Sequence, residues 1–368
     1  MTRPSEDVAF DLRPGIAPDG PGRRRGGRGP LVVVAVLAIL AVAAAAGWLL
    51  LGDGEPAPSV GRRAGGTHEL VAIGVLAGDE ALVAVIGAGG REEPGAVTVP
   101  GATVVEIPGA GGGSVEAAAR LPGDLLSLTV ANLLATEVHH HAVVGLDALA
   151  ASVDASGGVT LDVAGRLEVD GQRVGPGPTA VGGAEVMAYL SQSPRASRED
   201  RWIDVVTALL GGGFTFDAAA AVQTDDLRAV NGVIAGADGS VVEPLPVELR
   251  DGGIVRADEA ALPALLRDVF GIEAEPAVEV LVLNGNGSPG MGEIVARRIV
   301  GSGFRVVASG NARAFDVEVT EVRVSDPSLQ AQGEEVRRLL GLGTLILTEQ
   351  GSGLAPITVV MGHDVLDV

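Results

Sequence analysis

Residues 69–88 read ELVAIGVLAGDEALVAVIGA, which is two apolar runs rich in β-branched residues, separated by a Gly-Asp pair. A Gly-Asp dipeptide between two such runs is typical of a tight hairpin turn. The stretch therefore predicts two strands, at 69–76 and 81–88, and we expect folded structure to begin near His68.

Strand and helix patterns alternate downstream of this hairpin. The apolar spacing predicts further strands, two of them within 96–109 and one each at 137–146 and 159–169. It predicts helices at 114–135 with a break at Pro122, and at 147–158, 182–214 and 218–236. Residues 241–271 are expected to combine loop with one more helix.

Pro276 marks the start of a second predicted domain. Strands are expected within 278–284, 304–311, 317–325, 344–348 and 356–362, and helices at 291–303 and 327–341. Asp326 before Pro327 is a helix-start signal. This order predicts a small α/β sandwich, so the fold class is α/β throughout.

An uncharged apolar segment precedes the hairpin. Residues 31–51 read LVVVAVLAILAVAAAAGWLLL, and about 20 such residues, rising about 1.5 Å each, cross a bilayer core of about 30 Å. Arginines precede the segment, and Asp53 and Glu55 follow it. The positive-inside rule then predicts a single-pass plasma-membrane protein with a cytoplasmic N-terminus and extracellular C-terminal domains.

Two other interpretations of residues 31–51 compete with a membrane helix. A cleaved signal peptide has an apolar region of roughly 7–15 residues, which is shorter than this one. A buried soluble helix is disfavoured by the flanking arginines. We therefore expect a disordered arm at 1–30, a transmembrane helix at 31–51, a linker at 52–67, and folded domains at 68–271 and 276–368.

The composition excludes some partners. The formal net charge is −21, although the first 29 residues hold six arginines against four acids, so the acidic surface lies in the exported part. Such a surface repels nucleic acid, and we expect no nucleic-acid partner. There are no cysteines, so no disulfide holds the exported part together.

A series of ordered landmarks resembles the LytR-CpsA-Psr (LCP) family. Residues 276–367 resemble the LytR C-terminal domain that is often fused to it. The landmarks are Thr-Val-Pro at 98–100, Glu-Ala-Ala-Ala at 116–119, His-His-Ala-Val-Val at 140–144, Val-Asp-Ala-Ser-Gly-Gly-Val at 153–159, Gly-Ala-Glu-Val-Met-Ala-Tyr-Leu at 183–190 and Thr-Asp-Asp at 224–226. The resemblance implies an LCP-like mixed-sheet α/β domain at 68–271.

The resemblance also implies an activity. Family members transfer polyprenyl-pyrophosphate-linked glycopolymers onto peptidoglycan, using an aspartate pair for Mg²⁺, several arginines for the pyrophosphate and a hydrophobic tunnel for the lipid tail. Bidentate cations suit a pyrophosphate in a low-dielectric cleft, and Mg²⁺ prefers carboxylate oxygens.

Most of the family's site residues are missing at the matching positions. Leu76 stands at an aspartate position, and Gly101 and Ala102 stand at an arginine and an aspartate position. Further substitutions are Ser191 and Ser193 for arginines, and Asp204-Val205-Val206 for Arg-Gln-Gln. Removing one electrostatic donor typically costs about 10²–10³ in rate. The sequence therefore predicts the family fold with no catalytic residues.

A few residues remain as weak site candidates. Arg195, Arg198 and Arg201 recur at about one helical turn and could form a shifted phosphate clamp. We favour the alternative that they lie on a solvated helix face, paired with Glu199, Asp200 and Asp204. Asp79 is a weak metal-ligand candidate, although aspartate is also favoured in such a turn.

Two motifs suggest ligands but have structural explanations. His139, His140 and His141 are consecutive on a strand, so their side chains alternate between faces and cannot converge on one metal ion. Gly285-x-Gly287-x-x-Gly290 resembles a dinucleotide fingerprint, but no acid follows the second strand to bind a ribose. We expect those glycines to serve backbone geometry.

These observations favour a non-catalytic accessory or binding protein in cell-wall glycopolymer assembly. Its expected partners are the membrane and peptidoglycan, a polyprenyl-linked glycan or a paralogous LCP protein, and no cofactor is expected. One alternative is a divergent phosphotransferase that uses Mg²⁺ with Asp79 and the arginines of 195–201. A second alternative is an isoprenoid-lipid-binding module with an aliphatic tunnel.

Overall fold

The computed structural model describes residues 68–88, 94–163, 165, 167–169, 172–192, 198–217, 221–349 and 351–367, which all lie in one compact unit. The predicted arm, membrane segment and linker at 1–67 lie outside the described residues. None of the described helices is long and apolar enough to cross a membrane.

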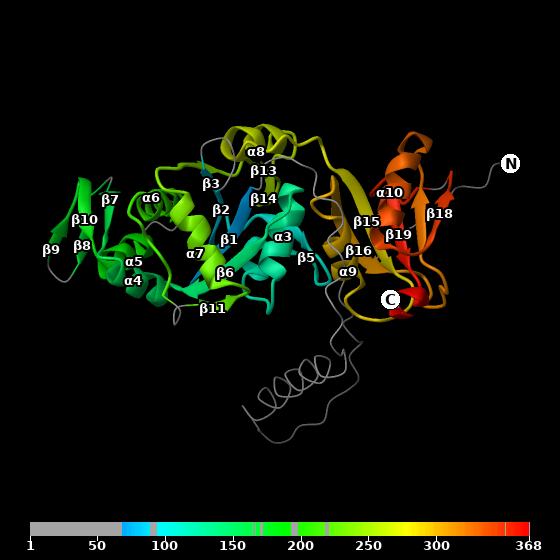
Figure 1. Cartoon of the computed structure of the whole chain (residues 1–368), viewed down its shortest axis with the longest axis horizontal. Helices are drawn as coiled ribbons and strands as arrows, with labels where there is room; N and C mark the ends of the chain where they lie inside the picture. Colours follow the sequence, from blue (N-terminus) through cyan, green and yellow to red (C-terminus); the bar gives the residue numbers. More distant parts are fainter. Residues whose placement is uncertain are drawn as a thin grey trace, which may run out of the picture. The chain divides into compact units, whose positions relative to one another are not determined.

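A six-stranded mixed sheet forms the centre of the first domain, in the order β11-β6-β1-β2-β3-β12 (Figure 1). Its strands are β1 (Glu69–Ala77), β2 (Glu80–Ala88), β3 (Gly95–Val99), β6 (His140–Gly145), β11 (Ala221–Thr224) and β12 (Val241–Pro244). β1 and β2 are antiparallel with Ala77 opposite Glu80, which confirms the predicted hairpin. β6 runs parallel to β1, and β12 runs parallel to β3.

Helices cover both faces of this sheet. The first core lies under α4 (Leu146–Ala155), α5 (Gly183–Ser191), α6 (Arg198–Leu210) and α7 (Leu227–Gly236). The second lies under α2 (Val115–Ala118), α3 (Leu125–Leu134) and α8 (Leu262–Phe270). In β1, Val71 and Ile73 belong to the first core and Leu70 and Ala72 to the second, so the strand is buried on both faces.

Short two-stranded pairs surround the central sheet. They are β4 (Val104–Ile107) with β5 (Gly111–Ser114), β7 (Val159–Val163) with β10 (Gly177–Val181), β8 (Leu167–Val169) with β9 (Gln172–Val174), and β13 (Val247–Arg250) with β14 (Ile254–Ala257). The strand predicted at 159–169 is therefore two strands, β7 and β8.

The helix predicted at 218–236 is partly wrong. Residues 221–224 form β11, an edge strand paired with β6, so tertiary pairing decides their structure, while residues 218–220 lie outside the described residues. The helix begins after Asp226, whose side chain accepts hydrogen bonds from the backbone N–H groups of Arg228 and Ala229 (3.0 and 3.1 Å). Residues 241–271 contain the predicted helix, α8, and also β12, β13 and β14, which were not predicted.

The second domain is a five-stranded sheet in the order β16-β15-β19-β17-β18, packed against two helices. The strands are β15 (Val278–Asn284), β16 (Phe304–Asn311), β17 (Glu321–Val324), β18 (Thr344–Leu347) and β19 (Ile357–Met361), and the helices are α9 (Met291–Ile299) and α10 (Gln330–Leu340). Short 3₁₀ turns, η2 (Pro327–Leu329) and η3 (His363–Asp367), complete it. The predicted small α/β sandwich is confirmed, and Asp326 accepts a hydrogen bond from Ser328 N (2.9 Å) at the predicted helix start.

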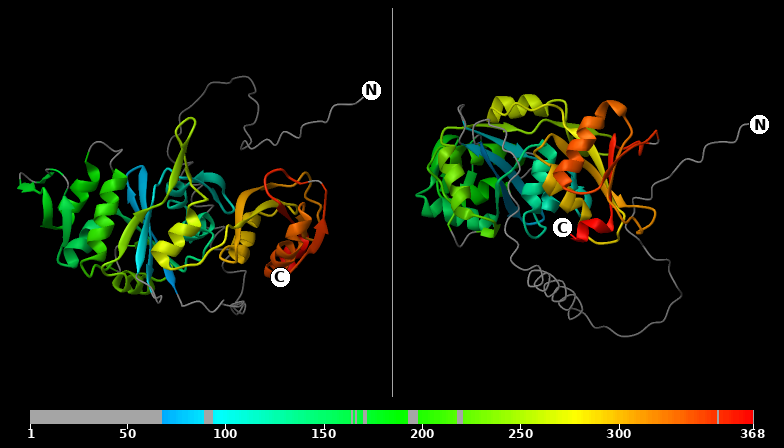
Figure 2. Two further views of the ribbon diagram at one scale, coloured as in Figure 1. Left: turned by 90° about the horizontal axis from the view of Figure 1, so that it is seen from above. Right: turned by 45° about the vertical axis from the view of Figure 1, so that its right-hand side comes forward.

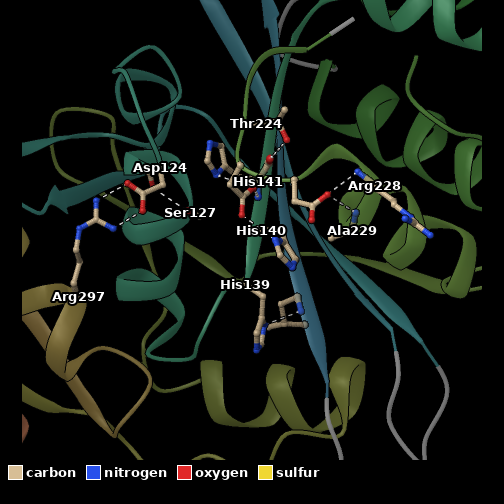
Figure 3. Close-up of polar contacts among 12 residues, drawn as sticks. Asp124, Ser127, His139, His140, His141, Thr224, Arg228, Ala229 and Arg297 are labelled. Atoms are coloured by element: carbon tan, nitrogen blue, oxygen red, sulfur yellow. Dashed lines mark hydrogen bonds and ion pairs between the residues drawn. The ribbon is translucent and has the colours of Figure 1, made fainter. Parts of the chain in front are cut away.

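Helix α3 joins the two domains. Its Leu128 is buried in the core of the second domain. The Asn132 side chain donates to the carbonyl of Val306 and accepts from its N–H, both at 2.8 Å and both buried. Arg297 on α9 forms a two-pronged ion pair with Asp124, just before α3, and this pair lowers the pKa of Asp124 (Figure 3).

We predict that Asn132→Ala lowers the free energy of unfolding by about 2–4 kcal/mol, because it leaves two buried backbone groups of Val306 unpaired. Urea denaturation monitored by circular dichroism measures the change. Asn311→Ala, at an exposed position on β16, is the matched control and should stay within about 0.5 kcal/mol of the native protein. An equal effect of the two substitutions would contradict this role of Asn132.

Candidate functional site

The structure places two of the three candidate arginines beside the turn of the central hairpin. Glu80 is the first residue of β2, directly after the Gly78-Asp79 turn. Arg198, Glu199 and Arg201 lie in the first turn of α6. These four residues are called the Glu80 cluster below. Arg195, the third candidate, lies outside the described residues.

Arg198 is buried against an acid. Its side chain forms an ion pair with the Glu80 carboxylate, and only 9% of the residue is exposed. Its Nε has no hydrogen-bond partner among the described residues. The backbone carbonyl of Glu80 accepts a hydrogen bond from Arg120 Nη2 (2.7 Å). A guanidinium in this setting is already neutralised by a carboxylate of the same protein.

Arg201 is also buried, with 7% of the residue exposed, and it donates to the carbonyl of Gln192 (2.7 Å). The favoured interpretation of a solvated helix face is therefore wrong for Arg198 and Arg201. The face of α6 that carries Trp202, Val205 and Leu209 packs on the sheet, and both arginines lie about one turn before residues of that face. Asp204, expected to pair with them, instead accepts a hydrogen bond from the Tyr189 hydroxyl (2.6 Å).

Glu199 is an acid held in an unfavourable environment. Burial raises its pKa to about 7, against a weak hydrogen bond from Gly101 N (3.4 Å to Oε1), and the neighbouring Glu80 carboxylate adds to the rise. Its Oε2 has no hydrogen-bond partner among the described residues. The cluster thus contains two arginines, Glu80 paired with Arg198, and Glu199, whose raised pKa of about 7 keeps its carboxyl partly protonated near neutral pH.

The backbone at Gly101 is closed by packing. A Cβ atom there would lie 2.4 Å from the carbonyl oxygen of Ala81, which no side chain tolerates without backbone movement. The backbone path between β3 and β4 therefore leaves no room for an arginine at position 101.

The interior beneath the cluster is filled. Trp202 is 1% exposed and donates from its indole N–H to the carbonyl of Val83 (3.0 Å). Phe214 and Phe216 stack edge to face, with ring centroids 4.9 Å apart. The remaining cavity beside these rings is about 10 Å³, room for about one water molecule.

The described residues do not fit a Mg²⁺ site. Asp79 is exposed in the hairpin turn, and Glu80 is committed to Arg198. Among the residues that the structure describes, no group of three or more histidines and acids is arranged to hold a metal ion. Magnesium prefers several converging carboxylate and water oxygens, and this turn does not supply them.

The three histidines lie at the start of β6, and each has a hydrogen-bond partner elsewhere in the fold (Figure 3). His139 Nδ1 accepts a hydrogen bond from Leu70 N (3.2 Å), and His140 Nδ1 lies 2.8 Å from a carboxylate oxygen of Asp225. The same carboxylate accepts from the backbone N–H of His141 (2.9 Å), while burial lowers the pKa of the His141 ring. The Thr-Asp-Asp landmark thus holds β11 to β6 and begins α7.

Backbone N–H groups of the glycine loop after β15 are hydrogen-bonded by side chains of the loop itself. Gly287 and Gly290 have φ values of +78° and +84°, which favour glycine, and this confirms that they serve backbone geometry. The Asn284 side chain accepts from the N–H of Gly287 (2.8 Å), and the Asn286 side chain accepts from that of Ser288 (2.8 Å). These side chains occupy amides that a phosphate would otherwise use.

A separate open hollow of about 830 Å³ lies beside the C-terminal half of α6. Its lining carries the acids Asp154, Asp162 and Asp204 among several glycines. The acids make this surface unsuitable for a phosphate group.

Sequence reasoning placed Glu199 beside these arginines, but it missed the burial of Glu199 and the part that Glu80 plays in the cluster. The α6 periodicity contained a usable signal, because Arg198 and Arg201 precede Trp202 and Val205 by four residues and so share their face. The acid opposite them was not visible, because the contact spans 118 residues.

Comparisons with known proteins place these features in context. Residues 277–364 match the family model described as LytR cell envelope-related transcriptional attenuator, which confirms the predicted LytR C-terminal domain. No curated protein matches the chain.

Several solved structures resemble the chain. TagU of Bacillus subtilis is 19% identical, with a TM-score of 0.44, covering 57% of this chain and 99% of its own. YwtF of Bacillus subtilis is 18% identical, with a TM-score of 0.48, covering 60% and 98%. A structure of TagT (YwtF) with bound octaprenyl pyrophosphate lipid is 18% identical, with a TM-score of 0.45, covering 60% and 94%. That protein is described as a LytR-CPS2A-psr family protein, the family that the sequence landmarks indicate.

We predict that Glu199→Gln raises the melting temperature above pH 7 and has no effect below about pH 4.5. The pKa of Glu199 is raised in the folded state from 4.5 to about 7. The folded state therefore favours the protonated acid, and the contribution of Glu199 to stability falls as the pH rises from 4.5 to 7. Glutamine mimics the neutral acid and removes this penalty.

Melting curves of the native protein and the variant, taken from pH 4 to pH 9, test this difference. Asp238→Asn is the control, because Asp238 is an exposed acid after α7, outside the Glu80 cluster, and its substitution should change the melting temperature little across this range. A loss of stability in Glu199→Gln that grows with pH would show that the ionised carboxylate is stabilising.

Proposed function

We propose that the chain is an envelope-facing LCP-like protein that acts in cell-wall glycopolymer assembly as a non-catalytic accessory or binding protein. In this proposal residues 31–51 anchor it in the plasma membrane and the domains after residue 68 lie outside the cell. The match of residues 277–364 to a cell-envelope family model supports the setting. The site geometry supports the absence of catalysis.

The observation that carries the proposal is the Arg198–Glu80 ion pair. A pyrophosphate that bound Arg198 would lie beside the Glu80 carboxylate or displace it, and in either case Glu80 would remain nearby as a like charge. At about 5 Å and an effective dielectric constant of about 20, that repulsion is roughly 3 kcal/mol for each pair of unit charges. Glu199 adds a further ionising acid at the same place.

Two further observations favour this function over its alternatives. A divergent phosphotransferase would need Mg²⁺ at Asp79 and free guanidinium groups, but the described part of the cluster pairs Arg198 with an acid and lacks a converging carboxylate set. An isoprenoid-binding module would need a tunnel, but the core beside Trp202 has room for about one water molecule.

We expect no release of polyprenyl phosphate when the full chain in detergent is incubated with Mg²⁺, a polyprenyl-pyrophosphate-linked glycan and peptidoglycan. Mass spectrometry of the lipid products measures the reaction. A family member that retains the aspartates and arginines serves as the positive control. Turnover that disappears in Arg201→Ala would overturn the proposal in favour of a phosphotransferase.

We also expect the full chain, purified from its membrane, to carry no stoichiometric polyprenyl lipid, because the core beside Trp202 is filled. Organic extraction followed by mass spectrometry tests this expectation. Lipid retained by the native chain and lost on Trp202→Ala would instead support the lipid-binding module.

A further inference from the structure

The β13–β14 hairpin projects from the first domain (Figure 2). β14 contacts the rest of the domain through an isolated β-bridge between Val255 and Thr103. β13 pairs with β14 on one side, and no described strand pairs with its other side. Residues Val247–Arg250 therefore form an open strand edge, called the β13 edge below.

The backbone of the β13 edge is arranged to receive another strand. The carbonyl of Pro246 accepts from Asp258 N (2.9 Å), and the carbonyl of Arg250 accepts from Gly253 N (3.1 Å), so both point toward β14. Backbone groups alternate in direction along a strand. The N–H and C=O groups of Val247 and Leu249 therefore point away from β14.

The side chains of the β13 edge are unusual for an exposed edge. Leu249 is 76% exposed and Val247 is 42% exposed, on the same face of the strand. Glu248 and Arg250 lie on the other face and form an ion pair with each other. Soluble proteins commonly protect such edges with proline, charges, short strands or a covering element. Here Pro246 precedes a four-residue strand that carries Glu248 and Arg250, but among the described residues no element covers the exposed Leu249 face.

We propose that two copies of this chain associate through the β13 edge, as antiparallel strands related by a two-fold axis at Leu249. In this register Leu249 lies opposite Leu249 of the second copy and exchanges both backbone hydrogen bonds with it. Glu248 then lies opposite Arg250 of the second copy, and Arg250 opposite its Glu248. The sequence Val-Glu-Leu-Arg is thus complementary to itself in charge.

The charge pattern favours a second copy over an unrelated strand. Within the hairpin, Arg256 lies directly opposite Glu248. In the paired state Glu248 would lie between Arg256 of its own chain and Arg250 of the second copy, so opposite charges alternate across three neighbouring strands, and Ile254 of the second copy follows on the fourth. A strand matches this pattern only if it places a cation opposite Glu248 and an anion opposite Arg250. A second copy of the chain does so by two-fold symmetry.

A cysteine experiment tests the register, because the native chain has no cysteine. In a hydrogen-bonded antiparallel pair the facing Cα atoms lie about 5.5 Å apart, within the disulfide range of about 4.4–6.8 Å. Leu249→Cys in the full chain, purified in detergent and mildly oxidised, should give a covalent dimer. Val241→Cys, at a 56% exposed residue on the edge strand β12, is the matched control and should remain monomeric.

A charge experiment tests the partner. In the Leu249→Cys background, adding Arg250→Glu or adding Glu248→Arg places like charges opposite each other, and each variant alone should lose at least about tenfold in cross-linking rate. Mixing the two variants makes every facing pair complementary and should restore it.

The proposal is overturned by either of two results. One is equal cross-linking of Leu249→Cys and Val241→Cys, which indicates random collision. The other is unchanged cross-linking of the charge variants alone, which indicates a different register or occupant. Both results are independent of whether the protein is catalytic.

Discussion

The central β1–β2 hairpin is buried on both faces, and this constraint determines the arrangement of the first domain. Residues of β1 alternate between two cores, so helices must cover the sheet on each side. Helix α6 meets this requirement with Trp202, Val205 and Val206. Because Arg198 and Arg201 share that face of α6, both side chains are buried near the hairpin turn. Glu80 neutralises one of them there, since a buried charge is costly without a partner.

The same packing explains why the site differs from what the family resemblance implies. The backbone at Gly101 approaches Ala81 too closely for any side chain, and the aromatic rings of Trp202, Phe214 and Phe216 fill the interior. The ion pair at Glu80 and the packed interior beside Trp202 thus both follow from how α6 lies on the sheet.

The sequence predicted the elements whose signals are local. The Gly-Asp turn, the break at Pro122 and the cap at Asp326 each act within a few residues, and the structure contains all three features. Residues 221–224 were mistaken for helix because they follow directly on an alanine run in the sequence, while their strand state depends on pairing with β6, about 80 residues away. The burial of Arg198 was missed for a related reason, since Glu80 is remote in sequence.

The clamp of Asn132 on Val306 also bears on how the two domains evolve together. The Asn132 side chain hydrogen-bonds to both the carbonyl and the N–H of Val306 on strand β16, and Leu128 packs in the neighbouring core. A C-terminal domain from another protein could replace this one only if its edge strand placed a backbone N–H and carbonyl opposite Asn132. It would also need a pocket for Leu128. An exchanged C-terminal domain without these features would leave Asn132 unpaired in a buried position and Leu128 without its core.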